Sequence, residues 1–133
     1  GKLQQHHMLS KRQTYAETPA EIRNFVKRTN DLIEVLYLAS SGKLIERMRI
    51  SSGGVQATVV DYRLILKRAI ELLAVQIVLV HNHPSGSAEP SSQDRTLTER
   101  VDEACRLFDI RLLDHIIIAR GDHYSFRGQG ELK

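Results

Sequence analysis

One short apolar run limits the possible folds more than any other feature of the sequence. Residues 75–81, VQIVLVH, are apolar almost throughout, which is typical of a strand covered on both faces of a sheet. Segments with helical spacing precede and follow this run. A helix, a buried strand and another helix in succession indicate a mixed sheet packed against helices.

The two flanking helices are predicted from their caps and their apolar spacing. Asp61 is a favourable cap for the segment YRLILKRAIELLA, and Ser91 or Ser92 begins the segment QDRTLTERVDEACRLF. In the first helix the apolar residues that fall mostly at helical spacing are Leu64, Leu66, Ile70 and Leu73. In the second helix they are Leu97, Val101, Ala104 and Phe108. The only cysteine, Cys105, is expected to point inward with this second set.

The rest of the chain predicts one more helix and two hairpins. A helix is expected from the Thr18 cap onward, over the segment TPAEIRNFVKRTN. Residues 32–51 predict two strands with a tight turn at Gly42, and residues 110–128 predict two strands around Gly121. The resulting order is α, β, β, α, β, α, β, β. We therefore predict a single α/β domain whose mixed sheet is flanked by helices.

Length and composition agree with one folded domain. The 133 residues are 41% apolar and 26% charged, which is sufficient for a core of its own. We expect a disordered leader over residues 1–18 and the domain over residues 19–133. The sequence shows no run of about 18 apolar residues and no signal segment, so we expect a cytoplasmic protein without membrane contact. The net charge of +3 is spread along the chain, so attraction to nucleic acid is expected to be weak.

Two histidines end the apolar run and predict a metal site. Residues two apart in a strand share a face, so His81 and His83 are expected to point the same way. The full spacing, H-x-H-x7-S-x2-D, brings Ser91 and Asp94 into the same segment. Two imidazoles and one carboxylate are a known ligand set for catalytic zinc, which keeps one position open for water. We predict one zinc ion per chain, bound by His81, His83 and Asp94, with the Ser91 hydroxyl nearby.

Ser91 and Asp94 also have a purely structural interpretation. A capping serine followed three residues later by an acid satisfies free amides at a helix start and suits the helix dipole. The paired histidines favour the metal site, because two buried imidazoles beside an acid are costly without a cation. Both interpretations remain open for Ser91 and Asp94.

Several segments together resemble a known family. The segment HNHPSGSAEPSSQD is similar to the JAMM signature of the MPN+ (JAB) metalloprotease-like domains, and AVQIVLVHNHPSG and LLDHIIIA resemble the RadC family in particular. The resemblance extends from about residue 20 to residue 131. It implies a mixed sheet flanked by helices, with zinc at the end of the buried strand. It also implies that His81, His83 and Asp94 are the zinc ligands, and that Ser91 helps to stabilise an oxyanion.

The same resemblance requires a general base upstream, which JAMM enzymes supply as a glutamate. In RadC-like sequences this residue lies just before the first apolar strand, where the chain reads TNDLIEVLYL. Asp31 is closest to that position and is one methylene shorter. Glu34 and Glu46 are the other candidates. Two of the three have a plain alternative: Asp31 is also interpreted as a solvated acid, and Glu34 as a charge on an edge strand.

The segment LLDHIII adds two further polar residues to an apolar strand. Asp114 and His115 resemble a recurring feature of the family and are interpreted either as partners that orient a zinc-bound imidazole or as satisfied core residues. His115 as a fourth ligand would instead close the site and make it structural. His123, in the final turn, is expected to be exposed.

Two functions from different classes follow. The first is a zinc-dependent hydrolase similar to JAMM metallopeptidases, which cleaves an amide or isopeptide bond in a protein or peptide substrate. The second is a metal-stabilised interaction module without catalysis, which acts with protein or DNA partners. The resemblance carries an association with DNA repair, for which these residues give no separate support. The sequence sets neither the substrate nor the oligomeric state.

Overall fold

The computed structural model describes residues 32–51, 60–84 and 86–132. The leader predicted over residues 1–18 and the helix predicted from Thr18 lie outside these residues. The elements described are β1 (Leu32–Leu38), β2 (Leu44–Ser51), α3 (Tyr62–Leu72), β3 (Gln76–Asn82), α4 (Ser92–Leu107), β4 (Arg111–Ala119) and β5 (Asp122–Ser125). Within the described part of the chain, their order confirms the predicted alternation of strands and helices.

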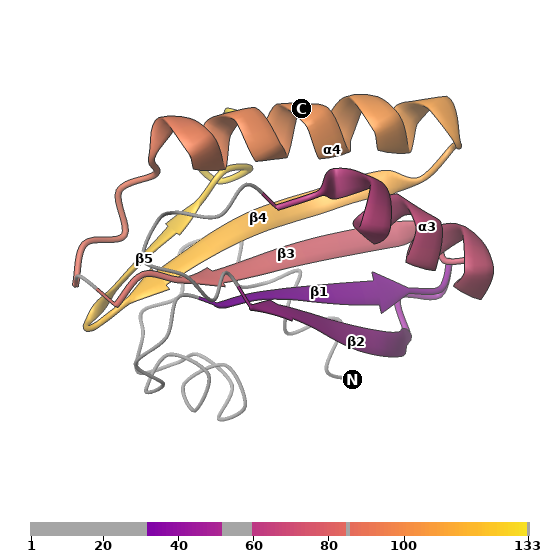
Figure 1. Ribbon diagram of the computed structural model, residues 1–133, viewed down its shortest axis with the longest axis horizontal. Coiled ribbons are helices and arrows are strands. Elements are labelled where there is room, and N and C mark those ends of the chain that lie inside the picture. The colour runs from indigo at the N-terminus through magenta and orange to yellow at the C-terminus, as the bar shows by residue number, and fades with distance from the viewer. Residues whose placement is uncertain (1–31, 52–59, 85, 133) are drawn as a thin grey trace.

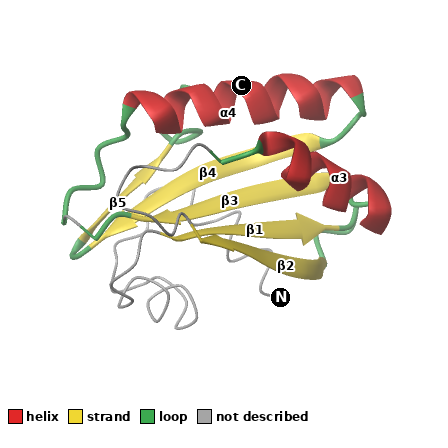
Figure 2. Ribbon diagram, in the orientation of Figure 1, coloured by secondary structure: helices red, strands yellow, loops and turns green. Residues whose placement is uncertain are grey.

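The five strands form one mixed sheet in the order β2-β1-β3-β4-β5 (Figure 1). The inner strands β3 and β4 are parallel, and every other neighbouring pair is antiparallel. A parallel pair needs a crossover connection, and α4 provides it. The ribbon coloured by secondary structure shows the strands as one continuous layer with α3 and α4 packed over it (Figure 2). The sheet therefore brings the ends of β3 and β4 to the same edge.

The two faces of the sheet carry separate apolar clusters. The face under α3 and α4 carries the larger one, with Val35, Ile77 and Ile117 from the strands packed against residues of both helices. The opposite face carries a second cluster that includes Val78 and Val80. β3 contributes to both clusters, which confirms the prediction that this strand is covered on both faces.

The inward face of α3 differs from the prediction. The buried residues are Ile65, Leu66 and Ala69, so the prediction is confirmed for Leu66. It is wrong for Leu64, Ile70 and Leu73, which are exposed. Two apolar stripes run along this helix, and apolar content alone does not select between them. The sheet selects the Ile65 stripe: the buried Tyr37 hydroxyl donates to the Ile65 carbonyl oxygen at 2.8 Å, and the small Ala69 packs in the same core cluster.

The inward face of α4 was predicted mostly correctly. Val101 and Cys105 are fully buried, and Leu97 and Ala104 pack partly buried against the same cluster. Phe108, by contrast, is 55% exposed, so its predicted place in the core is wrong. The helix ends at Leu107, and Asp109 takes a left-handed conformation (φ 57°). The chain therefore turns away before Phe108 can continue the apolar stripe.

Each of the two hairpin turns contains a glycine with a positive φ angle. Gly42 and Gly121 have φ values of 89° and 74°, which side chains with a Cβ rarely adopt. The cap predicted at Asp61 is also present, since its carboxylate accepts from the Arg63 amide at 3.0 Å. Among the described residues, neither helix has the length and apolar content needed to cross a membrane.

Candidate metal centre

The candidate site begins where β3 ends. His81 follows Ile77 and Leu79 in the alternation of the strand, so its ring lies on the face covered by the helices. Asn82, between the two histidines, takes the opposite direction and is buried. The His83 amide donates to the Ile118 carbonyl oxygen at 2.9 Å, which extends the pairing with β4 by one residue. Both imidazoles are therefore held on one face by the main chain of an inner strand.

The carboxylate of the site comes from the first turn of α4. The Ser91 side chain accepts from the Asp94 amide at 3.0 Å, and Asp94 Oδ2 accepts from the Ser91 amide at 2.8 Å. This reciprocal capping box fixes both the start of α4 and the rotamer of Asp94. Asp94 is only 4% exposed, although it lies in the first turn of a helix. The interpretation of Ser91 and Asp94 as a helix cap is confirmed. The same cap holds the Asp94 carboxylate beside His81 and His83.

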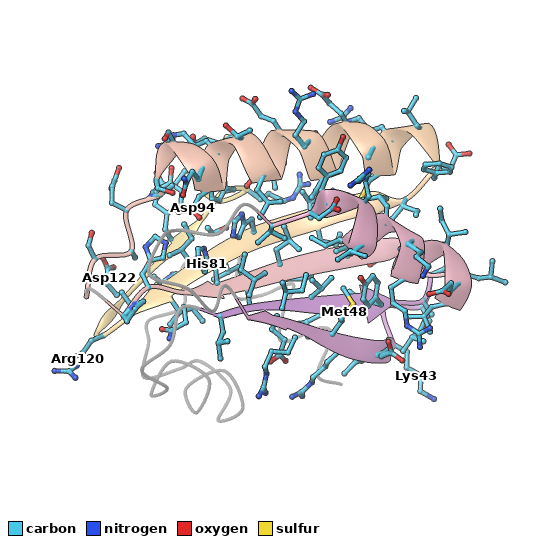
Figure 3. All side chains as sticks on the ribbon, viewed as in Figure 1. Lys43, Met48, His81, Asp94, Arg120 and Asp122 are labelled. Atoms are coloured by element: carbon cyan, nitrogen blue, oxygen red, sulfur yellow. The ribbon has the colours of Figure 1, made fainter. Side chains whose placement is uncertain are left out.

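The three side chains meet in one compact group. Figure 3 labels two of them, His81 on the sheet and Asp94 at the start of α4. His81 Nδ1 lies 2.9 Å from Asp94 Oδ1, and His83 Nε2 lies 3.1 Å from Asp94 Oδ2. The two imidazole rings meet edge to face, with centroids 4.6 Å apart. One nitrogen from each ring and one oxygen of Asp94 all lie within 4.8 Å of one another. A separation of this size suits three ligands around one ion.

The contacts of His83 show why a cation fits this group. His83 Nδ1 lies 3.0 Å from the carbonyl oxygen of Ser87, and a carbonyl can only accept, so Nδ1 carries the proton. In a neutral ring, Nε2 then has a bare lone pair that faces a carboxylate oxygen of Asp94. Two acceptors in this position need a proton or a metal ion between them. A carbonyl partner on the far nitrogen is also the usual support of a histidine that binds a metal.

Asp94 is ionised in this environment. Burial alone would raise the pKa of its carboxyl group. The contacts with the imidazoles of His81 and His83 and the hydrogen bond from the Ser91 amide outweigh burial and hold the pKa of Asp94 well below its usual range. The group therefore offers one negative charge and two imidazoles, which is a suitable donor set for a divalent ion such as zinc.

The candidates for the general base do not join this group within the described residues. Asp31 lies outside them. Glu34 alternates onto the opposite face of the sheet, where its carboxylate lies 3.7 Å from both Arg47 and Arg49. Glu46 pairs with Arg68 of α3 at 2.6 Å, toward the other end of the sheet. Neither glutamate can reach His81 or His83 from these positions.

Asp114 and His115 point to opposite faces of β4. Asp114 accepts from the amides of His115 and Arg127 and from the hydroxyl of Ser125, so it anchors the segment after β5. His115 is fully buried on the helix face, and burial lowers its pKa to about 3, with a smaller contribution from His81. Among the described residues, the compact group consists of three side chains and does not include His115.

His115 instead contacts the site through a residue that the sequence interpretation missed. Thr98 Oγ1 lies 2.7 Å from His115 Nδ1 and donates to the Asp94 carbonyl oxygen at 2.7 Å. Its spacing of four residues from Asp94 places it on the same face of α4, which is the signal that could have indicated it. His123, on β5, is partly exposed and lies outside the group.

The fold and the site together define a class of protein. A mixed sheet that presents two histidines from the end of an inner strand, opposite a carboxylate in the first turn of the next helix, is the arrangement of a JAB domain with a possible metal site. The chain matches the family model of the RadC-like JAB domain over residues 9–131, nearly its whole length. The chain therefore belongs to the RadC family, which confirms the resemblance seen in its sequence.

Proposed function

We propose that this protein is a zinc-dependent hydrolase of the JAMM type, which cleaves an amide or isopeptide bond in a protein or peptide substrate. The observation that carries this proposal is the convergence of His81, His83 and Asp94 within 4.8 Å at the end of an inner strand. Three protein ligands leave a coordination position for a reactant, which distinguishes catalytic from structural zinc sites. The ligand set and the family favour zinc over other divalent ions.

The residues around the site have separate tasks in this proposal. His81, His83 and Asp94 hold the ion, which supplies Lewis acidity that activates water and polarises a carbonyl group. Ser91 is exposed and lies directly before the turn that carries Asp94. Its oxygen accepts from the Asp94 amide, and a hydroxyl that accepts can still donate its own proton. We assign Ser91 to the stabilisation of the oxyanion that develops during amide cleavage.

We assign the general base to Asp31. It lies outside the described residues, and the support comes from the strand that follows it. β1 begins at Leu32, runs antiparallel to β3, and pairs Ile33 with His81. The described odd-numbered residues of β1 near this end, Ile33 and Val35, share the helix face with His81, whereas Glu34 does not. The end of β1 that pairs with His81 is therefore the end that follows Asp31 in the sequence.

The hydrolase proposal is tested with tag-free protein, zinc, and a panel of fluorogenic peptide and isopeptide substrates. We expect cleavage that a chelator abolishes and added zinc restores. Asp94→Asn should lose bound zinc and cleavage together, whereas Asp102→Asn, farther along the same helix, should keep both. Cleavage that survives both chelation and Asp94→Asn would overturn the proposal.

A second candidate is a metal-stabilised interaction module that binds protein or DNA partners without catalysis. One observation favours it: in the described part of the chain, no carboxylate other than Asp94 joins the His81 and His83 group. Bound zinc in a wild type that cleaves no substrate of the panel would support this candidate. In either case we propose a cytoplasmic protein, because the single cysteine is buried and unpaired, as is usual in a reducing compartment.

A further inference from the structure

A fully buried histidine lies beside the candidate metal centre without belonging to it. His115 is on β4, its ring stacks on Phe126 with centroids 4.9 Å apart, and the centroid of the His81 ring lies 6.0 Å from its own. The three rings follow one another from the core to the site. An apolar residue would fill this place in the core at a lower desolvation cost. The presence of an imidazole therefore calls for a role beyond packing.

The hydrogen bonds of Thr98 define the state of this ring. The Thr98 hydroxyl has one proton, which it donates to the Asp94 carbonyl oxygen at 2.7 Å. Its oxygen can then only accept from His115 Nδ1, also at 2.7 Å, so Nδ1 carries the ring proton. Because the ring is fully buried and neutral, Nε2 keeps a lone pair, and it has no hydrogen-bond partner among the described residues.

The direction of His115 is set by a bulge in β4. Ile77 pairs with Leu112 and Val78 with Asp114, so Leu113 is an extra residue in the strand. Regular alternation from Leu112, which faces the helices, would turn Asp114 to the site and His115 away from it. Because of the bulge, His115 turns toward the helices and Asp114 turns away from them.

Arg127 holds the bulge in place. Its guanidinium group donates to the carbonyl oxygens of Leu112 and Leu113, and its amide donates to Asp114 Oδ1 at 2.9 Å. The local backbone is therefore built to present His115, and not Asp114, to the helix that carries the carboxylate. A bulge that re-aims one side chain is common beside functional sites.

We propose that His115 and Thr98 are positioning residues of the metal centre, which lock the first turn of α4, and with it Asp94, against the rings of His81 and His83. The chain of contacts runs from β4 through His115 and Thr98 to the main chain of Asp94. It joins the helix that supplies the carboxylate to the strand next to the two histidines. This inference rests on the proposed function, since it takes the group as a metal site.

The test compares metal affinity in variants of two threonines on α4. Thr96 makes the same hydrogen bond to the carbonyl oxygen four residues earlier, at 3.0 Å, but it is exposed. We expect Thr98→Val to weaken zinc binding about 10- to 100-fold in competition with a chelator, as is usual for groups that support a ligand. Thr98→Ser, which keeps the hydroxyl, and Thr96→Val, the matched control, should stay within about twofold of wild type.

The tautomer of the His115 ring can be measured in the metal-free protein and gives a second test. Long-range 15N–1H spectra of the metal-free protein should show the Nδ1-H tautomer of His115 in the wild type and a changed signal in Thr98→Val. His115→Phe, which keeps a ring in the stack, should weaken zinc binding as much as Thr98→Val, and the double variant should lose no more than either alone. Additive losses would contradict a shared chain of contacts.

The outcomes separate the inference from the function on which it rests. If the wild type binds zinc and Thr98→Val binds it as tightly as Thr96→Val does, the positioning role is overturned and the hydrolase proposal stands. An Nε2-H tautomer in the wild type would overturn the assigned hydrogen bond. A wild type that binds no zinc would overturn the proposed function together with this inference.

Discussion

At the residue scale, Asp94 connects the stability of α4 to the candidate site. One of its oxygens closes the capping box with Ser91, and both oxygens face the imidazoles of His81 and His83. The same carboxylate therefore satisfies a free amide at the helix start and supplies the negative charge of the group. A substitution at Asp94 would remove both contributions, so the separate roles are better tested at Ser91.

Ser91 allows the cap and the proposed catalytic role to be separated. Ser91→Ala should lower the free energy of unfolding by about 1 kcal/mol, because the Asp94 amide loses its partner. Ser91→Asp should keep most of this stability, since aspartate is an equally good cap. Both variants should cleave substrate about 100-fold more slowly, because neither side chain has a hydrogen-bond donor for the oxyanion. Urea unfolding and steady-state rates measure the two effects. An Asp variant as active as wild type would contradict the oxyanion role.

Glu34 provides a test of the general base. Its carboxylate lies on the face of the sheet opposite to His81 and contacts Arg47 and Arg49. Glu34→Gln should therefore leave zinc content and cleavage unchanged. Asp31→Asn should reduce the rate at least about 100-fold while zinc remains bound. Loss of activity in Glu34→Gln, with Asp31→Asn still active, would show that the base is assigned to the wrong residue.

At the scale of elements, the start of each helix could be predicted from the sequence better than its inward face. Asp61 and Ser91 act as caps through contacts within three residues, which a local pattern contains. The face of α3 depends on Tyr37, which lies 28 positions before Ile65 in the chain. The contact of His115 with Thr98 likewise joins two elements and depends on the bulge at Leu113. Periodicity within one segment carries no information about such partners.

The face of α3 is tested by a pair of alanine substitutions. Ile65→Ala removes a fully buried side chain and should lower the free energy of unfolding by about 2–5 kcal/mol. Leu64→Ala removes a neighbouring side chain that is 53% exposed. This substitution should change the free energy of unfolding by about 0.5 kcal/mol or less. Chemical denaturation of both variants measures the difference. Equal losses, or a larger loss for Leu64→Ala, would contradict the observed packing.

At the scale of the whole molecule, the mixed sheet explains why residues distant in the chain form one site. β3 and β4 run parallel, so the connection after His83 must cross the sheet, and α4 returns over the face that carries both rings. The spacing of His81, His83 and Asp94 was sufficient to predict this group, because all three lie within one strand, loop and helix start. The general base could not be fixed in the same way, because its candidates, Asp31, Glu34 and Glu46, all lie far from the two histidines in the sequence.

Metal binding should stabilise the whole domain, since the ligands come from two different elements. At a free zinc concentration about 100 times the dissociation constant, the free energy of unfolding should rise by about 2.7 kcal/mol. Thermal unfolding should therefore shift upward by several degrees with zinc and return with a chelator. His83→Ala should show no shift. An equal shift in His83→Ala would indicate that zinc binds elsewhere.

The most direct test of the account is the metal content of protein purified without a histidine tag. Elemental analysis of wild type, His83→Ala and His123→Ala compares a residue of the site with a histidine outside it on β5. We predict about one zinc per chain in the wild type and in His123→Ala, and none in His83→Ala. No metal in the wild type, or zinc retained in His83→Ala, would contradict a metal centre at the end of β3.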